Sequence, residues 1–140
     1  MSIDKLAQEL QPYLVKVSEQ GRRELAVQIA KELRRSQSSR IRKQQNPDGS
    51  KYASRKKASK KKLFSRIRTY SFLKNQITDS SIAIAFFGRI ARIANVHQHG
   101  QIDRPAKSQA PVRYPKRELL GFSDDDIRLI EDISRKFLQF

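Results

Sequence analysis

The chain has 140 residues, and its 30 Lys and Arg against 14 Asp and Glu give a formal net charge of +16. This length predicts a single domain covering residues 1–140. Leu, Ile, Val and Phe together make up about a quarter of the residues, which is enough for a hydrophobic core and excludes complete disorder. The chain has no cysteine, so disulfide scaffolds, Cys-ligated zinc sites and thiol nucleophiles are excluded.

The hydropathy of the chain argues against targeting and membrane-spanning segments. Residues 1–6 do not begin an apolar run of signal-peptide length. The longest uncharged stretch, residues 80–88, has nine residues, whereas about 18 or more apolar residues are needed to span a bilayer. We therefore expect no membrane partner, and we expect the excess positive charge to meet a polyanion or an acidic protein.

The positive charge is concentrated in residues 34–68, which we call the basic segment. It holds 14 of the 30 cationic side chains and one acidic residue, Asp48, and only four of its 35 residues are Leu, Ile, Val or Phe. Its densest stretch, residues 55–62, has six cations in eight positions. Such a composition repels itself and has little to bury. We expect an extended arm or long loop that lies between two better-packed parts and contributes little to the core.

Helical periodicity dominates the first part of the chain. Apolar residues three and four positions apart predict a short helix over residues 3–10. A second helix is predicted from about Pro12, which suits the first helical position, to Ser36 or beyond. The evidence for it is a long apolar stripe with helical spacing, formed by Leu14, Val17, Leu25, Ile29 and Leu33.

The middle of the chain predicts a turn and a pair of strands. Asn46-Pro47-Asp48-Gly49 is typical of a turn, because Pro47 fixes its own φ and Gly49 tolerates the exit geometry. The pattern over residues 63–70 fits either a short helix or the approach to a strand. Residues 82–86 alternate large and small side chains, which predicts a strand with residues 72–77 as its antiparallel partner and residues 78–81 as the turn.

The last part of the chain predicts two helices joined by an irregular connection. Apolar spacing over residues 90–97 predicts a short helix that Gly100 ends, with His97 packed at its end and His99 in the following turn. Three prolines lie between residues 101 and 117, which predicts an exposed, irregular segment. Ser123 is a candidate N-cap for a final helix.

These elements predict an α+β fold. A long N-terminal helix and a C-terminal helix are expected to pack around a small antiparallel sheet, with the basic segment as an extended insertion.

No constellation of residues predicts an enzyme. His97 and His99 supply two ligands, whereas zinc takes three or four protein ligands. Asp124, Asp125 and Asp126 are successive helical residues that point about 100° apart, so they cannot converge on one ion, and capping of a helix explains them better. Phosphate-binding loops, nucleophile elbows and HExxH motifs are missing from the sequence. We expect no catalytic residue, no cofactor and no metal site.

The basic segment has three readings. Its cations can bind nucleic-acid phosphates without sequence preference, they can meet an acidic protein surface in an assembly, or the segment can be a solvated loop without a partner. Aromatic residues that could stack on bases are sparse, with only Tyr52 and Phe64 inside it. The candidate contacts to DNA or an acidic partner are Arg55, Lys56, Lys57, Lys60, Lys61, Lys62, Arg66 and Arg68.

Three stretches of the chain form an ordered set: residues 40–49 with Tyr52 just after, residues 92–100, and residues 114–123 followed by Asp126 and Ile127. Together they resemble the phage virion morphogenesis family, the tail completion proteins of temperate, contractile-tailed bacteriophages. The resemblance covers nearly the whole chain. It implies no catalytic residues, and the family-motif positions are expected to have structural roles: Pro47, Asp48, Gly49, His97, Gly100, Arg117 and Gly121.

The resemblance implies a non-enzymatic structural protein of the virion that completes the tail at the head–tail junction. It implies a homo-oligomeric ring with six subunits as the favoured number. The other implied partners are the tail tube or sheath and the neck or connector proteins. The protein would lie in the virion, and in the host cytoplasm during assembly. Whether it is a tail terminator or an adaptor nearer the portal stays open.

The net charge adds an expectation of its own, namely contact with genomic DNA in the channel of the ring. The alternative function is a stand-alone, sequence-independent nucleic-acid-binding protein.

Overall fold

The computed structural model describes residues 8, 18–56, 59–79 and 81–138. Apart from residue 8, the predicted helix over residues 3–10 lies outside the described residues, and so does the predicted start of the second helix at Pro12. The elements are α2 (Glu19–Arg42), β1 (Leu73–Ile77), β2 (Ile82–Phe86), α3 (Ile90–His99), β3 (Ile102–Asp103), β4 (Val112–Arg113) and α4 (Asp124–Phe137). The predicted α+β class is confirmed.

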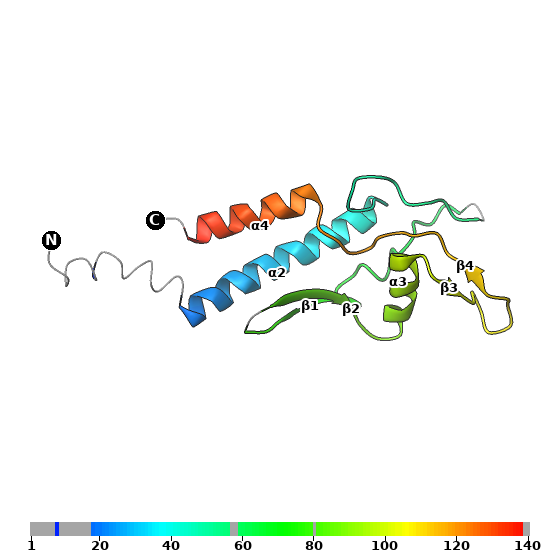
Figure 1. Cartoon of the computed structure of the whole chain (residues 1–140), viewed down its shortest axis with the longest axis horizontal. Helices are drawn as coiled ribbons and strands as arrows, with labels where there is room; N and C mark the ends of the chain where they lie inside the picture. The colour runs from blue at the N-terminus through cyan, green and yellow to red at the C-terminus, as the bar shows by residue number, and fades with distance from the viewer. Residues whose placement is uncertain (1–7, 9–17, 57–58, 80, 139–140) are drawn as a thin grey trace.

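The two long helices lie side by side along the molecule (Figure 1). Helix α2 begins after Ser18, whose hydroxyl accepts a hydrogen bond from the Gly21 N–H at 3.2 Å. It continues to Arg42, in agreement with the predicted end at Ser36 or beyond. Helix α4 begins after Ser123, and the predicted N-cap is confirmed, because Ser123 and Asp126 form a reciprocal capping box. The strands β1 and β2 lie along the side of α2 away from α4 (Figure 1).

The predicted strand pair is confirmed as an antiparallel hairpin. Its register runs from Leu73 opposite Phe86 to Ile77 opposite Ile82. Because side chains alternate across a strand, Leu73, Ile77 and the large residues of β2 share one face of this hairpin. The connection after α3 was predicted to be irregular, but it contains a second small antiparallel pair, β3 with β4.

Helix α3 ends as predicted at Gly100, whose φ of 62° lies in the left-handed region. His99, which was expected in the following turn, is instead the last residue of the helix. Residues 63–70 are a succession of turns that leads to β1 at Leu73, so the second of the two predicted alternatives holds and the helix does not form.

The hydrophobic core corrects the prediction for the basic segment. The buried cluster consists of Ile41, Tyr52, Ile67, Ala94 and Leu119, and the first three of these belong to residues 34–68. Residues 34–42 are the last part of α2 rather than an extended arm. The few apolar side chains of the segment are buried or half-buried, whereas most of its described cations are exposed and Arg40 alone among them is buried. Its average composition therefore understated its contribution to the core.

In the part of the chain that the structure describes, no helix is long and apolar enough to cross a bilayer.

Candidate functional site

The three stretches that carry the family resemblance meet in space and form one framework. The side-chain oxygen of Asn46 accepts a hydrogen bond from the Glu118 N–H at 2.8 Å. The side-chain oxygen of Gln98 accepts bonds from the N–H groups of Leu119 and Leu120, both at 2.9 Å. The Gln98 amide in turn donates to the Leu120 carbonyl at 2.8 Å. Residues 118–120 are thus held from both sides by segments more than twenty positions away.

Close packing explains why small residues occupy two family-motif positions. A Cβ added to Gly121 would lie 2.6 Å from the Pro47 Cγ, which is closer than real atoms approach. A Cβ added to Gly100 would lie 3.2 Å from the Lys116 Cβ, and the φ of 62° already favours glycine there. Asp48 holds the turn itself, since its carboxylate accepts a bond from the Ser50 N–H at 2.9 Å.

Arg117 connects this framework to the chain just after the turn. It is 4% exposed, and its guanidinium donates to the carbonyls of Ala53 at 2.9 Å and Ser54 at 3.1 Å. A third donor faces the Nδ1 atom of His97 at 3.1 Å. Among the described residues, no carboxylate forms an ion pair with Arg117. The donors of its guanidinium are therefore hydrogen-bonded, but its positive charge is not neutralised.

His97 is buried as a neutral ring. Arginine can only donate, so the Nδ1 atom of His97 must accept, and its proton lies on Nε2. The ring packs edge-on against Phe64, with centroids 4.8 Å apart, and against Tyr114, with centroids 5.0 Å apart. Burial, followed by the positive charge of Arg117, lowers the pKa of His97 to about 4. The side chain is thus committed to packing, and its metal-binding reading has no support in the geometry.

A second buried cluster ties α4 to α2. Asp126 is fully buried, and its carboxylate lies 3.1 Å from a guanidinium nitrogen of Arg40. The same carboxylate accepts bonds from the Gln37 amide at 3.0 Å and from the Ser36 hydroxyl. Burial alone would raise the pKa of Asp126. The hydrogen bonds from Ser36, the Ser123 backbone and Gln37, together with the charge of Arg40, outweigh burial and hold that pKa below its ordinary value.

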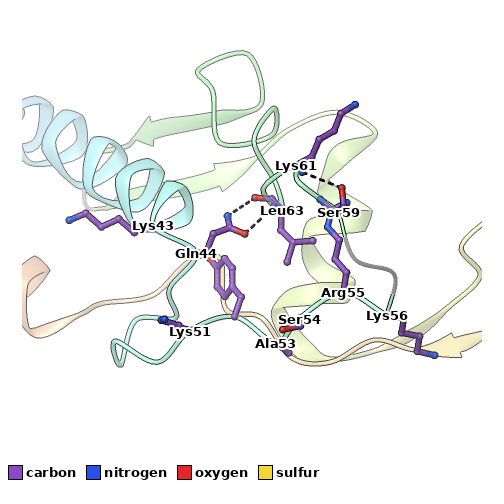
Figure 2. A pocket seen from close by; sticks show the side chains of 11 residues that line it. Lys43, Gln44, Lys51, Ala53, Ser54, Arg55, Lys56, Ser59, Lys61 and Leu63 are labelled. Atoms are coloured by element: carbon purple, nitrogen blue, oxygen red, sulfur yellow. Dashed lines mark hydrogen bonds between the residues drawn. The ribbon is translucent and has the colours of Figure 1, made fainter.

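Beside the framework lies a cavity of about 680 Å³, which we call the basic hollow (Figure 2). Its cationic lining residues come from three stretches of the chain, and no acidic residue among those that the structure describes lines it. The lining residues are Lys43, Gln44, Lys51, Tyr52, Ala53, Ser54, Arg55, Lys56, Ser59, Lys61 and Leu63. The dashed lines in Figure 2 show the Gln44 amide bonded to both the N–H and the C=O of Leu63, at 2.9 and 2.8 Å.

The structure brings together only some of the predicted contact residues. Arg55, Lys56 and Lys61 line the basic hollow, whereas Lys60 and Lys62 are exposed outside its lining. Lys57 lies outside the described residues. Arg66 is exposed elsewhere, and Arg68 points toward the Ser38 hydroxyl of α2 at 3.4 Å.

Two lining cations, Lys43 and Lys51, were missed by the sequence analysis. The turn at residues 46–49 was the available signal, because a reversal of the chain there brings the residues before and after it together. The structure shows this reversal as a bridge between Gln45 and Lys51. Over the described residues, no group of three or more His, Cys, Asp or Glu side chains is arranged to hold a metal ion.

Comparison with known proteins gives the family. The pattern of the phage virion morphogenesis family matches residues 1–139. The chain is 36% identical to tail completion protein S of Escherichia phage P2, and the match covers 84% of each chain. No solved structure matches this chain. The chain therefore belongs to the phage virion morphogenesis family.

Proposed function

We propose that this chain is a structural virion protein that completes the phage tail at the head–tail junction by assembling into an oligomeric ring. The observation that carries the proposal is the family match over residues 1–139, together with the relative named as a tail completion protein. The three stretches that suggested the family form one hydrogen-bonded framework, which fits a structural role for them.

The buried polar groups support a docking role rather than catalysis. His97 is bonded to Arg117, Arg117 holds two carbonyls, and Asp126 is paired with Arg40. Each of these groups is bonded to another side chain or to the backbone within the fold. None of them combines exposure to solvent with a free partner position, as an acid, a base or a nucleophile requires.

The charge distribution supports assembly with neighbours of opposite charge. A subunit of net charge +16 repels its own copies unless acidic groups or a polyanion lie between them. Helix α4 offers exposed carboxylates at Asp124, Asp125 and Asp132. In a ring, one surface of each subunit meets a different surface of the next. We infer that carboxylates of α4 meet cations of the neighbouring subunit.

Complementation tests this function. A phage that lacks the gene is expected to make filled heads and tails that do not join, and addition of the purified protein to the lysate should restore infectious particles. Electron microscopy of the restored particles should show ring-shaped density at the head-proximal end of the tail. Normal joining of heads and tails without the gene would refute the proposal.

The basic hollow favours one alternative, a stand-alone nucleic-acid-binding protein. That alternative requires that the monomer act away from the particle. Detection of the protein in purified virions, at a fixed number of copies per tail, would exclude it.

A further inference from the structure

We propose that the basic hollow is a binding site for the sugar-phosphate backbone of duplex DNA. This inference deepens the proposed function, because a protein at the head–tail junction lies on the path of the genome. It can nevertheless be tested on the isolated protein.

The charged side chains that line the hollow are all positive. Within the described part of the chain, the lining contains five cations and no carboxylate. The cations are Lys43, Lys51, Arg55, Lys56 and Lys61. Arg117 lies directly behind one wall, since it donates to the carbonyl of the lining residue Ser54 at 3.1 Å. A concave surface with charges of one sign focuses the electric field and concentrates counter-ions.

The walls are fixed before any ligand arrives. Arg117 holds the backbone at Ala53 and Ser54, and Gln44 holds the backbone at Leu63. Arg117 is buried and Gln44 is half-buried. Because the backbone at Ala53, Ser54 and Leu63 is held in place, binding does not have to order these three wall positions, which lowers its entropic cost.

The cations spread around the hollow instead of converging on one point. In Figure 2 the ends of Lys43, Lys56 and Lys61 reach outward in different directions from the backbone that carries them. A single small anion would be contacted by few of these groups, whereas an extended chain of phosphates passes several of them. Four of the five cations are lysines, which act as point charges and suit phosphates without fixed geometry. The hydroxyls of Ser54 and Ser59 are further hydrogen-bond donors in the lining.

The aromatic residues near the hollow are not available to stack on bases. Tyr52 is 8% exposed and points its hydroxyl at the Glu118 carbonyl, 3.3 Å away. Phe64 packs between Tyr52 and His97, with centroid distances of 5.7 and 4.8 Å. Single-stranded nucleic acid is bound with aromatic platforms. The site therefore fits the outside of a duplex, where only phosphates are contacted and base sequence is not read.

The test is binding of a short fluorescent duplex of mixed sequence, followed by anisotropy over a range of salt concentrations. Five phosphate contacts predict a slope of log affinity against log salt of about −4 to −5. The triple variant Lys51→Glu, Arg55→Glu, Lys61→Glu is expected to weaken binding at least roughly tenfold and to make the slope shallower by about 3.

A matched control carries the same change of charge outside the hollow. The variant Arg89→Glu, Arg104→Glu, Lys107→Glu reverses three exposed cations and should leave the salt slope near that of the unmodified protein. Equal weakening by both variants would overturn the proposal, because binding would then follow net charge alone. If the first variant fails to fold, as judged by circular dichroism, the milder Lys51→Gln, Arg55→Gln, Lys61→Gln variant makes the same comparison.

A competitor distinguishes phosphate from carboxylate. Polyglutamate at the same concentration of charge should displace the duplex poorly. Displacement equal to that by unlabelled DNA would overturn the assignment to a phosphate backbone and indicate an acidic protein partner. If the protein restores tail joining but does not bind DNA, this inference alone is rejected. If it binds DNA but heads and tails join without the gene, the proposed function alone is rejected.

Discussion

Replacement of His97 by Gln should remove most of the dependence of folding stability on pH between pH 7 and pH 5. The pKa of His97 is lowered to about 4 in the folded protein, first by burial and then by the charge of Arg117. In the unfolded chain it returns to about 6.5. Between these values the unfolded chain binds a proton that the folded protein does not bind, so a fall in pH favours unfolding.

The size and sign of the effect follow from this difference. The stabilising contribution is complete above the unfolded pKa, is lost as the pH falls, and is exhausted below the folded pKa. Integration of the linkage relation from pH 7 to pH 5 gives a loss of about 2 kcal/mol in the free energy of unfolding. Stopping at about pH 5 keeps the measurement above the range in which ordinary carboxylates gain protons.

The assay is urea unfolding followed by far-ultraviolet circular dichroism at constant ionic strength, with linear extrapolation to water at each pH. The chain has two histidines, and the exposed one provides the control. The variant His97→Gln should be less stable at pH 7 but nearly independent of pH, whereas His99→Gln should keep the slope of the unmodified protein. A flat profile in the unmodified protein, or an equal slope in His97→Gln, would refute the assignment of a buried neutral ring.

Two further predictions concern the framework and the contact between the helices. Asp126→Asn leaves Arg40 as a buried charge without its partner and should cost about 3 kcal/mol or more of stability. Asp124→Asn, at an exposed position of the same first turn, should cost less than about 1 kcal/mol, as thermal melts can measure. Gly121→Ala should lower stability by about 1–3 kcal/mol through the clash with Pro47. Pro47→Ala combined with Gly121→Ala should recover part of that loss, and strictly additive effects in this double-mutant cycle would contradict the proposed contact.

Local features of the sequence predicted those parts of the fold that depend on neighbouring residues. The hairpin of residues 73–86 follows from side-chain alternation and a polar turn. In the structure, its register places the large residues of β2 on the same face as Leu73 and Ile77. Ser123 and Gly100 were identifiable as helix ends because capping depends on the residues within one turn.

Long-range contacts could not be predicted in the same way. The pairing of Arg40 with Asp126 joins residues 86 positions apart, and the hydrogen bonds of Arg117 to residues 53 and 54 span more than sixty. Nothing in the local pattern distinguishes these arginines from the many exposed ones. The basic segment was misjudged for a related reason, because averaging over 35 residues hid the inward positions of Ile41, Tyr52 and Ile67.

The two buried arginines show how one residue type can serve two purposes. Arg40 faces the carboxylate of Asp126, so its charge is neutralised where it lies and its effect is to hold α2 and α4 together. Arg117 faces carbonyl oxygens and a neutral imidazole, which satisfy its donors but leave its charge intact. The charge of Arg55, a lining residue of the basic hollow, contributes after burial to lowering the pKa of Arg117. The positive charges of Arg55 and Arg117 therefore repel one another. An arginine paired with a carboxylate could hold the backbone at Ala53 and Ser54 equally well, but it would add no net charge. Because Arg117 is not paired, it both holds this wall of the basic hollow and adds to the positive potential that a polyanion meets there.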